Sequence, residues 1–232
     1  MLARSPLNPV PSTEMLPVPR RPLPYVRDGV CTARDFLPEA DFERVRADCR
    51  RLHRKMKREK NSVASGRVGC FVDRRSETHR VLTSGAVLAQ VSRLVGQPMA
   101  LSAHPIELRS YRVGAEMRWH RDDQLYDQAQ CELVLCLHNS SDSRTEWIDA
   151  EGQHFAEWTP ANTALLVRGG DTGAAHRVTP LKRGERTILK MVWAVPGSTP
   201  LPSFFEHFDA LPGLRGKVRR GLQKSGRGRS RS

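Results

Sequence analysis

The chain has 232 residues, 38% of them hydrophobic, and a formal net charge of +13. This length suits one folded domain with extensions. No apolar run approaches the roughly 18 residues that span a bilayer, and the first residues lack the apolar stretch of a secretory signal. We therefore expect no membrane span and no secretion.

The five cysteines form no Cys-x-x-Cys pair, so neither a zinc site nor a disulfide framework is indicated. An intracellular, reducing compartment is the expectation, cytoplasmic by default. The first residues are Arg-rich and poor in acids, which leaves an organelle leader open. The basic tail leaves the nucleus open.

The two ends of the chain differ in composition from the body. Residues 1–24 contain seven prolines and predict a disordered leader. Residues 215–232 contain eight basic residues and no acid, and predict a disordered Gly/Ser/Arg tail. Such a tail is suited to nucleic acid, to an acidic partner or to simple solvation. It has no aromatic residues to stack on bases.

Residues 25–104 predict the helical N-terminal part of the domain. One helix is expected over 36–60, with an apolar stripe at steps of three and four that comprises Phe42, Val45, Cys49, Leu52 and Met56. A second is expected over 84–95, with Thr83 as N-cap and Gly96 as its end. Residues 61–82 show no clean period.

Residues 105–214 change to short strands separated by turn signals. The expected strands are 106–112, 116–122, 131–138, 154–158, 163–168, 175–179 and 186–194. Many short strands at this spacing are typical of a sandwich or barrel. Residues 200–214 predict a short closing segment in which Phe204 and Phe205 pack back onto the strands.

Three residues predict a metal site. His120 and Asp122 are two apart, so on a strand both side chains point to one face, and His176 follows a glycine-rich loop. Two imidazoles and one carboxylate are the facial triad of non-haem Fe(II) oxygenases. Ten residues after His176, Arg186 could clamp the carboxylate of an organic cosubstrate.

The surroundings of these residues resemble a known family. The segments YRVGAEMRWHRDD, CELVLCLHN, TPANTALLV and HRVTPLKRGER occur in order over residues 105–195. Together they resemble the catalytic domain of 2-oxoglutarate and Fe(II)-dependent dioxygenases, with the prolyl 4-hydroxylase-like branch as the closest. One departure is the stretch from Ser140 to Trp147, where the family commonly has Gly-Gly-Glu-Thr.

The resemblance implies a fold, a site and a reaction. The fold is mainly β, with a double-stranded β-helix (jelly roll) core and N-terminal helices packed on the outside. His120, Asp122 and His176 match the catalytic iron ligands, Arg186 the residue that pairs with 2-oxoglutarate, and Tyr111 a tyrosine that hydrogen-bonds the same carboxylate. Fe(II), 2-oxoglutarate, O2 and ascorbate are the implied cofactors and cosubstrates.

The implied activity is hydroxylation of a prolyl or other residue of a protein or peptide, with release of succinate and CO2. Three alternatives stay open: an oxidative demethylase, a small-molecule hydroxylase, and a non-catalytic jelly-roll binding module. Alkylated-nucleobase demethylases carry a second arginine after the position of Arg186, which this chain lacks. The intact triad speaks against a binding module. The sequence fixes neither the oligomeric state nor the substrate.

Overall fold

The computed structural model describes residues 23–59 and 63–209. Most of the proline-rich leader and all of the basic tail lie outside these residues, so both remain predictions. Within the described ranges, no helix is long and apolar enough to cross a membrane.

Five α-helices, one 3-10 helix and eleven strands make up the described chain. The helices are α1 (Pro24–Asp28), α2 (Glu39–Leu52), the 3-10 helix η1 (His53–Lys55), α3 (Glu77–Leu82), α4 (Gly85–Val95) and α5 (Pro202–Asp209). The strands are β1 (Val30–Ala33), β2 (Lys57–Arg58), β3 (Ala64–Phe71), β4 (Ala100–Leu101), β5 (Glu107–His120), β6 (Gln130–Asn139), β7 (Thr145–Ile148), β8 (His154–Glu157), β9 (Ala164–Arg168), β10 (His176–Val178) and β11 (Arg186–Ala194).

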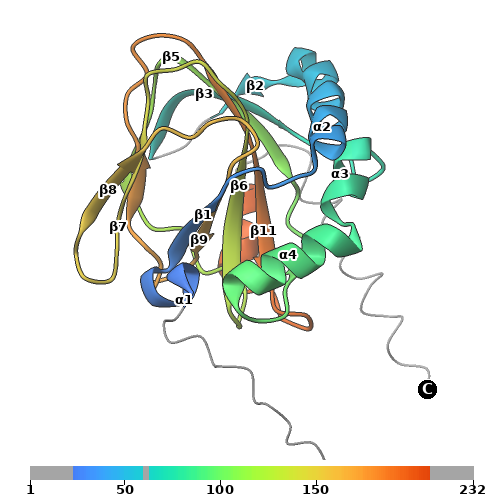
Figure 1. The fold of residues 1–232 in the computed structure, drawn as a ribbon, viewed down its shortest axis with the longest axis vertical. Coiled ribbons are helices and arrows are strands. Elements are labelled where there is room, and N and C mark those ends of the chain that lie inside the picture. Colours follow the sequence, from blue (N-terminus) through green and yellow to red (C-terminus); the bar gives the residue numbers. More distant parts are fainter. Residues whose placement is uncertain (1–22, 60–62, 210–232) are drawn as a thin grey trace, which may run out of the picture.

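The strands form one curled antiparallel sheet in the order β1-β9-β6-β11-β5-β10-β7-β8. Strand β3 pairs with β5 and carries β2, and β4 pairs with the end of β11. The first half of β5 pairs with β11 and its second half with β10. Strand β5 therefore joins the two halves of the sheet, and Figure 1 shows the β7–β8 hairpin on the side away from helices α2 to α4.

The outer face of the central strands packs against the helices. Its apolar residues join those of α2, α3 and α4 in one buried cluster that includes Phe42, Val45, Val87, Val91, Leu108, Leu133, Leu135, Leu189, Met191 and Trp193. Because side chains alternate along a strand, the residues between these point into the curl. Both predicted helices therefore pack on the outside of the sheet, as expected, and the mainly β jelly-roll fold is confirmed.

Local signals explain where the helices begin and end. The hydroxyl of Ser84 accepts a hydrogen bond from the N–H of Val87, and Gly96 ends α4 in the left-handed conformation with φ of 83°. The predicted cap, Thr83, instead donates its hydroxyl hydrogen to the carbonyl of His79 at the end of α3. A one-residue shift of this kind arises because Ser and Thr are both good caps and only the packing of α3 against α4 selects between them.

Several elements differ from the sequence prediction. The two strands expected at 106–112 and 116–122 are one strand, β5, because β3 pairs with both halves of it. The chain continues through Gly114, whose φ is 85°. The helix expected over 36–60 ends at Leu52. Strands β3 and β7 and helix α3 were not predicted, since their stability comes from pairing and packing with distant segments.

The predicted closing segment is confirmed as helix α5. Phe204 is fully buried against Leu125, Tyr126 and Val192, and Phe205 packs beside it.

Candidate metal and cosubstrate site

Three side chains converge inside the curl of the sheet. The ligand atoms of His120, Asp122 and His176 all lie within 4.8 Å of one another. His120 Nε2 is 3.7 Å from Asp122 Oδ1, and His176 Nε2 is 3.6 Å from Asp122 Oδ2. His120 ends β5 and pairs in register with His176, the first residue of β10. Strand pairing thus brings the two histidines together, and all three residues that the sequence singled out meet at one place.

Asp122 lies just beyond the end of β5 and reaches the site from a loop, not from the strand expected over 116–122. Its backbone carbonyl accepts a hydrogen bond from Gly170, and Arg121 Nε donates to the carbonyl of Gly173. A Cβ at Gly173 would lie 2.0 Å from the carbonyl oxygen of Arg168, so only glycine fits there. The glycine-rich loop before His176 therefore also holds the loop that carries Asp122.

The two imidazoles are oriented for metal binding. Nδ1 of His120 lies 2.9 Å from the carbonyl of Arg118, and Nδ1 of His176 lies 3.1 Å from the carbonyl of Ala174. Because each Nδ1–H donates to a carbonyl, each Nε2 keeps its lone pair toward Asp122. The buried Nε2 of His120 has no hydrogen-bond partner in the described chain.

Burial lowers the pKa of both imidazoles, and for His120 the neighbouring His176 lowers it further. Both rings are therefore neutral near pH 7, which is the form that binds a metal. An N2O donor set with open positions suits Fe(II). The residues present fit the metal that the sequence predicts.

Arg186 begins β11 and is 2% exposed. One terminal nitrogen donates to the hydroxyl of Thr145 at 2.8 Å, while its buried Nε has no partner in the described chain. No Asp or Glu of the described residues forms an ion pair with it. A buried guanidinium that has no carboxylate partner within the protein can bind the carboxylate of a ligand.

Tyr111 pairs in register with Arg186 on one side and with Arg67 of β3 on the other. Arg67 donates to the Tyr111 hydroxyl at 3.2 Å and is held by Glu59 at 2.6 Å. Burial alone would raise the pKa of Tyr111, but Arg67 and Arg109 outweigh it and lower that pKa. Tyr111 therefore lies beside Arg186, and its hydroxyl is oriented by Arg67, a residue that the sequence did not point to.

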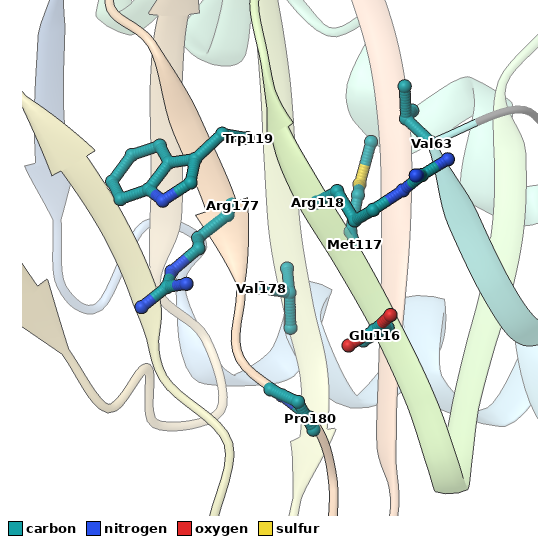
Figure 2. A pocket seen from close by; sticks show the side chains of 8 residues that line it. All are labelled: Val63, Glu116, Met117, Arg118, Trp119, Arg177, Val178 and Pro180. Atoms are coloured by element: carbon teal, nitrogen blue, oxygen red, sulfur yellow. The ribbon is translucent and has the colours of Figure 1, made fainter.

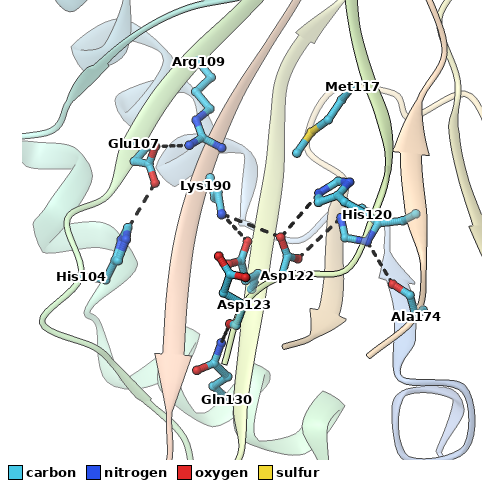
Figure 3. Close-up of polar contacts among 12 residues, drawn as sticks. His104, Glu107, Arg109, Met117, His120, Asp122, Asp123, Gln130, Ala174 and Lys190 are labelled. Carbon is cyan, nitrogen blue, oxygen red and sulfur yellow. Dashed lines mark hydrogen bonds and ion pairs between the residues drawn. The ribbon is translucent and has the colours of Figure 1, made fainter. Parts of the chain in front are cut away.

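Figure 3 shows two further groups of paired charges, one around Glu107 and one around Asp122. Arg109 pairs with Glu107, and Lys190 lies 2.6 Å from Glu132 and 4.0 Å from Asp122. Burial alone would raise the pKa of Glu107, but Arg109 and Lys190 hold it at about 2. Glu132 and Lys190 each stand between apolar residues of a strand, and a charge in that position is the sequence signal that points to them.

The interior face continues from the triad to the edge of the sheet through two aromatic rings. Trp147 of β7 pairs in register with His176, and Phe155 of β8 pairs with Trp147. The rings of Trp147 and Phe155 stack with centroids 5.6 Å apart, and Phe155 is 37% exposed. His120, His176, Trp147 and Phe155 thus form one row across four neighbouring strands. This row ends at the exposed ring of Phe155 on the last strand of the sheet.

A cavity of about 350 Å³ lies on the same strands but contains no member of the triad (Figure 2). Its lining includes Trp119, which precedes His120, and Arg177, which follows His176. The guanidinium of Arg177 lies 5.0 Å from the centre of the Trp119 ring. Because neighbours in a strand alternate, Trp119 and Arg177 are directed away from the triad, so this cavity is not the predicted iron site.

The fold is shared with enzymes of known structure. A prolyl-4-hydroxylase from Pseudomonas putida aligns with a TM-score of 0.59 and 18% identity, over 74% of this chain and 95% of that one. The α-ketoglutarate-dependent epimerase SnoN from nogalamycin biosynthesis aligns with a TM-score of 0.67 and 15% identity, over 82% and 85%. A Trichoplax adhaerens prolyl hydroxylase, solved with a hypoxia-inducible factor peptide, gives 0.60 and 15%, over 74% and 85%. The comparison with curated proteins gave no match.

The fold is that of the jelly-roll dioxygenases. The sequence model of the phytanoyl-CoA dioxygenase family matches residues 25–142, just over half of the chain. The chain belongs to this family, and the predictions of the superfamily and of an enzyme are confirmed. The matched residues include His120 and Asp122 but end before His176 and Arg186.

Proposed function

We propose that His120, Asp122 and His176 bind Fe(II), and that Arg186 binds the distal carboxylate of 2-oxoglutarate with help from Tyr111. The observation that carries this proposal is the convergence of two free Nε2 atoms on one carboxylate. The buried Arg186, which has no acidic partner in the described chain, supports the cosubstrate assignment.

When bound, the iron and 2-oxoglutarate activate O2 for attack on a substrate C–H bond, and succinate and CO2 are released. The side chains of this protein bind and orient. The carbonyls of Arg118 and Ala174 fix the two imidazole rings through their Nδ1–H groups. Arg67 donates to the Tyr111 hydroxyl and orients it, and Tyr111 pairs in register with Arg186. Burial of these groups excludes water from the reacting atoms.

For the substrate, we propose a prolyl or other residue of a protein or peptide. Two structural neighbours are prolyl hydroxylases by name, and one of them was solved with a peptide. The exposed Phe155 ring and its partner Trp147 lie on the face and in the row of His176. Flat aromatic surfaces of this kind bind proline rings and other apolar rings.

A small-molecule substrate is the second candidate. The epimerase SnoN has a higher TM-score than either prolyl hydroxylase, and it belongs to the biosynthesis of a small molecule. The stretch from Ser140 to Trp147, which departs from the prolyl 4-hydroxylase pattern, ends in the ring that faces this site. A screen with proline-rich peptides and ring-bearing small molecules, followed by detection of a 16 Da mass gain, separates the two candidates.

Three further expectations complete the proposal. Ascorbate would keep the iron reduced during turnover, as in the resembling family. The five cysteines are free thiols, which supports an intracellular compartment. The basic tail is proposed to make any contact with nucleic acid, since phosphate neutralisation needs clustered cations.

The first experiment measures succinate formed from 2-oxoglutarate with and without Fe(II), in the wild type and in His176→Ala. We expect iron-dependent succinate in the wild type and background in the variant. Metal binding is measured in parallel by calorimetry under anaerobic conditions. A wild-type protein that binds no divalent metal, or a variant that binds and turns over normally, would contradict the iron assignment.

A further inference from the structure

A buried lysine–glutamate pair lies behind the carboxylate of the triad. Lys190 and Glu132 are 8% and 2% exposed, and Nζ of Lys190 is 2.6 Å from Glu132 Oε2. The same nitrogen is 4.0 Å from Asp122 Oδ1 (Figure 3). The ammonium group therefore lies between a carboxylate that belongs to the sheet and one that belongs to the triad.

Stability does not account for this pair. A buried ion pair is generally no more stabilising than apolar side chains of similar volume. Three of the neighbouring inward positions of the same two strands are apolar, namely Val134, Ile188 and Val192, and the fourth, Gln130, is uncharged. The fold therefore accepts apolar residues on this face, and the charges of Lys190 and Glu132 call for another explanation.

Asp122 needs a restraint that its loop does not supply. Its backbone is held by Gly170, but no N–H or O–H group of the described chain forms a hydrogen bond with its carboxylate oxygens. The ionisable groups of the described chain within 4.0 Å of these oxygens are the two imidazoles, which belong to the triad, and the ammonium group of Lys190. Lys190 is therefore the one group outside the triad, among the described residues, that forms an ion pair with this carboxylate.

We propose that Lys190 is a positioning residue which fixes the Asp122 carboxylate toward the two Nε2 atoms, and that Glu132 both holds Lys190 in place and offsets its charge. A lone ammonium group beside the triad would repel a divalent metal. The Lys190–Glu132 pair is neutral as a unit, so it orients Asp122 without that repulsion. This inference rests on the proposed metal site.

The test uses Co(II), which reports ligand geometry through its visible absorption. Affinity and spectrum are measured on the full chain for the wild type, Lys190→Met, Glu132→Gln and the double variant Lys190→Met/Glu132→Leu. Lys182→Met, a change at an exposed lysine, is the matched control. We expect Lys190→Met to weaken Co(II) binding about tenfold, as the loss of a group that orients a ligand does, and to shift the spectrum.

Glu132→Gln should also weaken binding, since the ammonium group is then uncompensated. The double variant should lose less than the sum of the two single losses, because no unpaired charge remains, yet should keep the altered spectrum. If Lys190→Met does not fold, the double variant gives the same answer, since it buries no unpaired charge.

Wild-type affinity and spectrum in a folded Lys190→Met or double variant would overturn the proposal. A different result would show that the proposed metal site itself is wrong. In that case the wild type binds no Co(II), or His176→Ala binds it as well as the wild type does. If His176→Ala loses Co(II) while both Lys190 variants keep normal affinity and spectrum, the positioning role alone is wrong.

Discussion

The two faces of strands β5, β6 and β11 are built from the same stretches of sequence and differ in almost every physical property. The outer face carries Leu108, Leu135 and Leu189, which pack on the helices. The inner face carries buried charges, among them Arg186 and Lys190. Burial of the outer face stabilises the fold, whereas burial of charges costs desolvation that the pairs only partly recover.

This difference indicates a division of tasks between the faces. Substitutions on the outer face should change the free energy of unfolding and leave ligand binding intact. Substitutions on the inner face should change ligand binding by more than they change stability.

The largest expected effect in this comparison concerns Arg186. Arg186→Ala removes the buried cation that is proposed to bind the 2-oxoglutarate carboxylate. Loss of one partner of a buried charged pair costs about 2–5 kcal/mol of binding free energy, so the KM for 2-oxoglutarate should rise roughly 100-fold. Co(II) affinity should stay within a few-fold of wild type. Arg186→Lys should recover part of the loss, because lysine keeps the charge but not the planar fork. A normal 2-oxoglutarate requirement in Arg186→Ala would show that the clamp is elsewhere.

Leu135→Ala tests the outer face. Leu135 is fully buried in the cluster with the helices, so its truncation should cost about 2–5 kcal/mol in the free energy of unfolding, measured by denaturant titration. The Co(II) affinity of the folded protein should not change. Leu23→Ala, the same change at a residue 42% exposed, should cost much less. An altered Co(II) spectrum in Leu135→Ala would mean that the two faces are coupled.

Phe155→Ala tests the far end of the inner row. The loss of one ring from a stacked pair removes about 0.5–1.5 kcal/mol, so the KM for the organic substrate should rise roughly three- to tenfold. The KM for 2-oxoglutarate should be unchanged, because Arg186 lies on another strand. The measurement uses the first substrate that the peptide and small-molecule screen identifies. An equal change in both KM values would place Phe155 outside the substrate surface.

Ser84→Ala should have the smallest effect. Loss of the helix cap should lower the free energy of unfolding by about 1 kcal/mol and leave every ligand affinity unchanged. Thr83→Ala, which removes the residue that the sequence pattern favoured, should cost less, since that hydroxyl donates to the carbonyls of His79 and Arg80 and caps no N–H group of α4. Equal losses in the two variants would mean that both hydroxyls act as caps.

Local patterns predicted the elements that carry their own signals. Helix α4 has an apolar stripe and a terminal glycine, and β11 is a nine-residue strand rich in apolar and β-branched residues, so both were predicted to within a residue or two. Strand β3 has neither alternation nor an apolar run, and it forms because β5 pairs with it along its length. Strand β7 was missed for the same reason, since it forms by pairing with β8 and β10.

The sequence by itself predicted the class of enzyme and singled out His120, Asp122 and His176, because these residues lie in an ordered series of motifs that resembles a known family. Only the tertiary structure decided what surrounds them. Arg67 beside Tyr111, Lys190 with Glu132 behind Asp122, and Phe155 against Trp147 are contacts between separate strands. Such contacts depend on strand register, which is set by the packing of the whole sheet and leaves no local trace in the sequence.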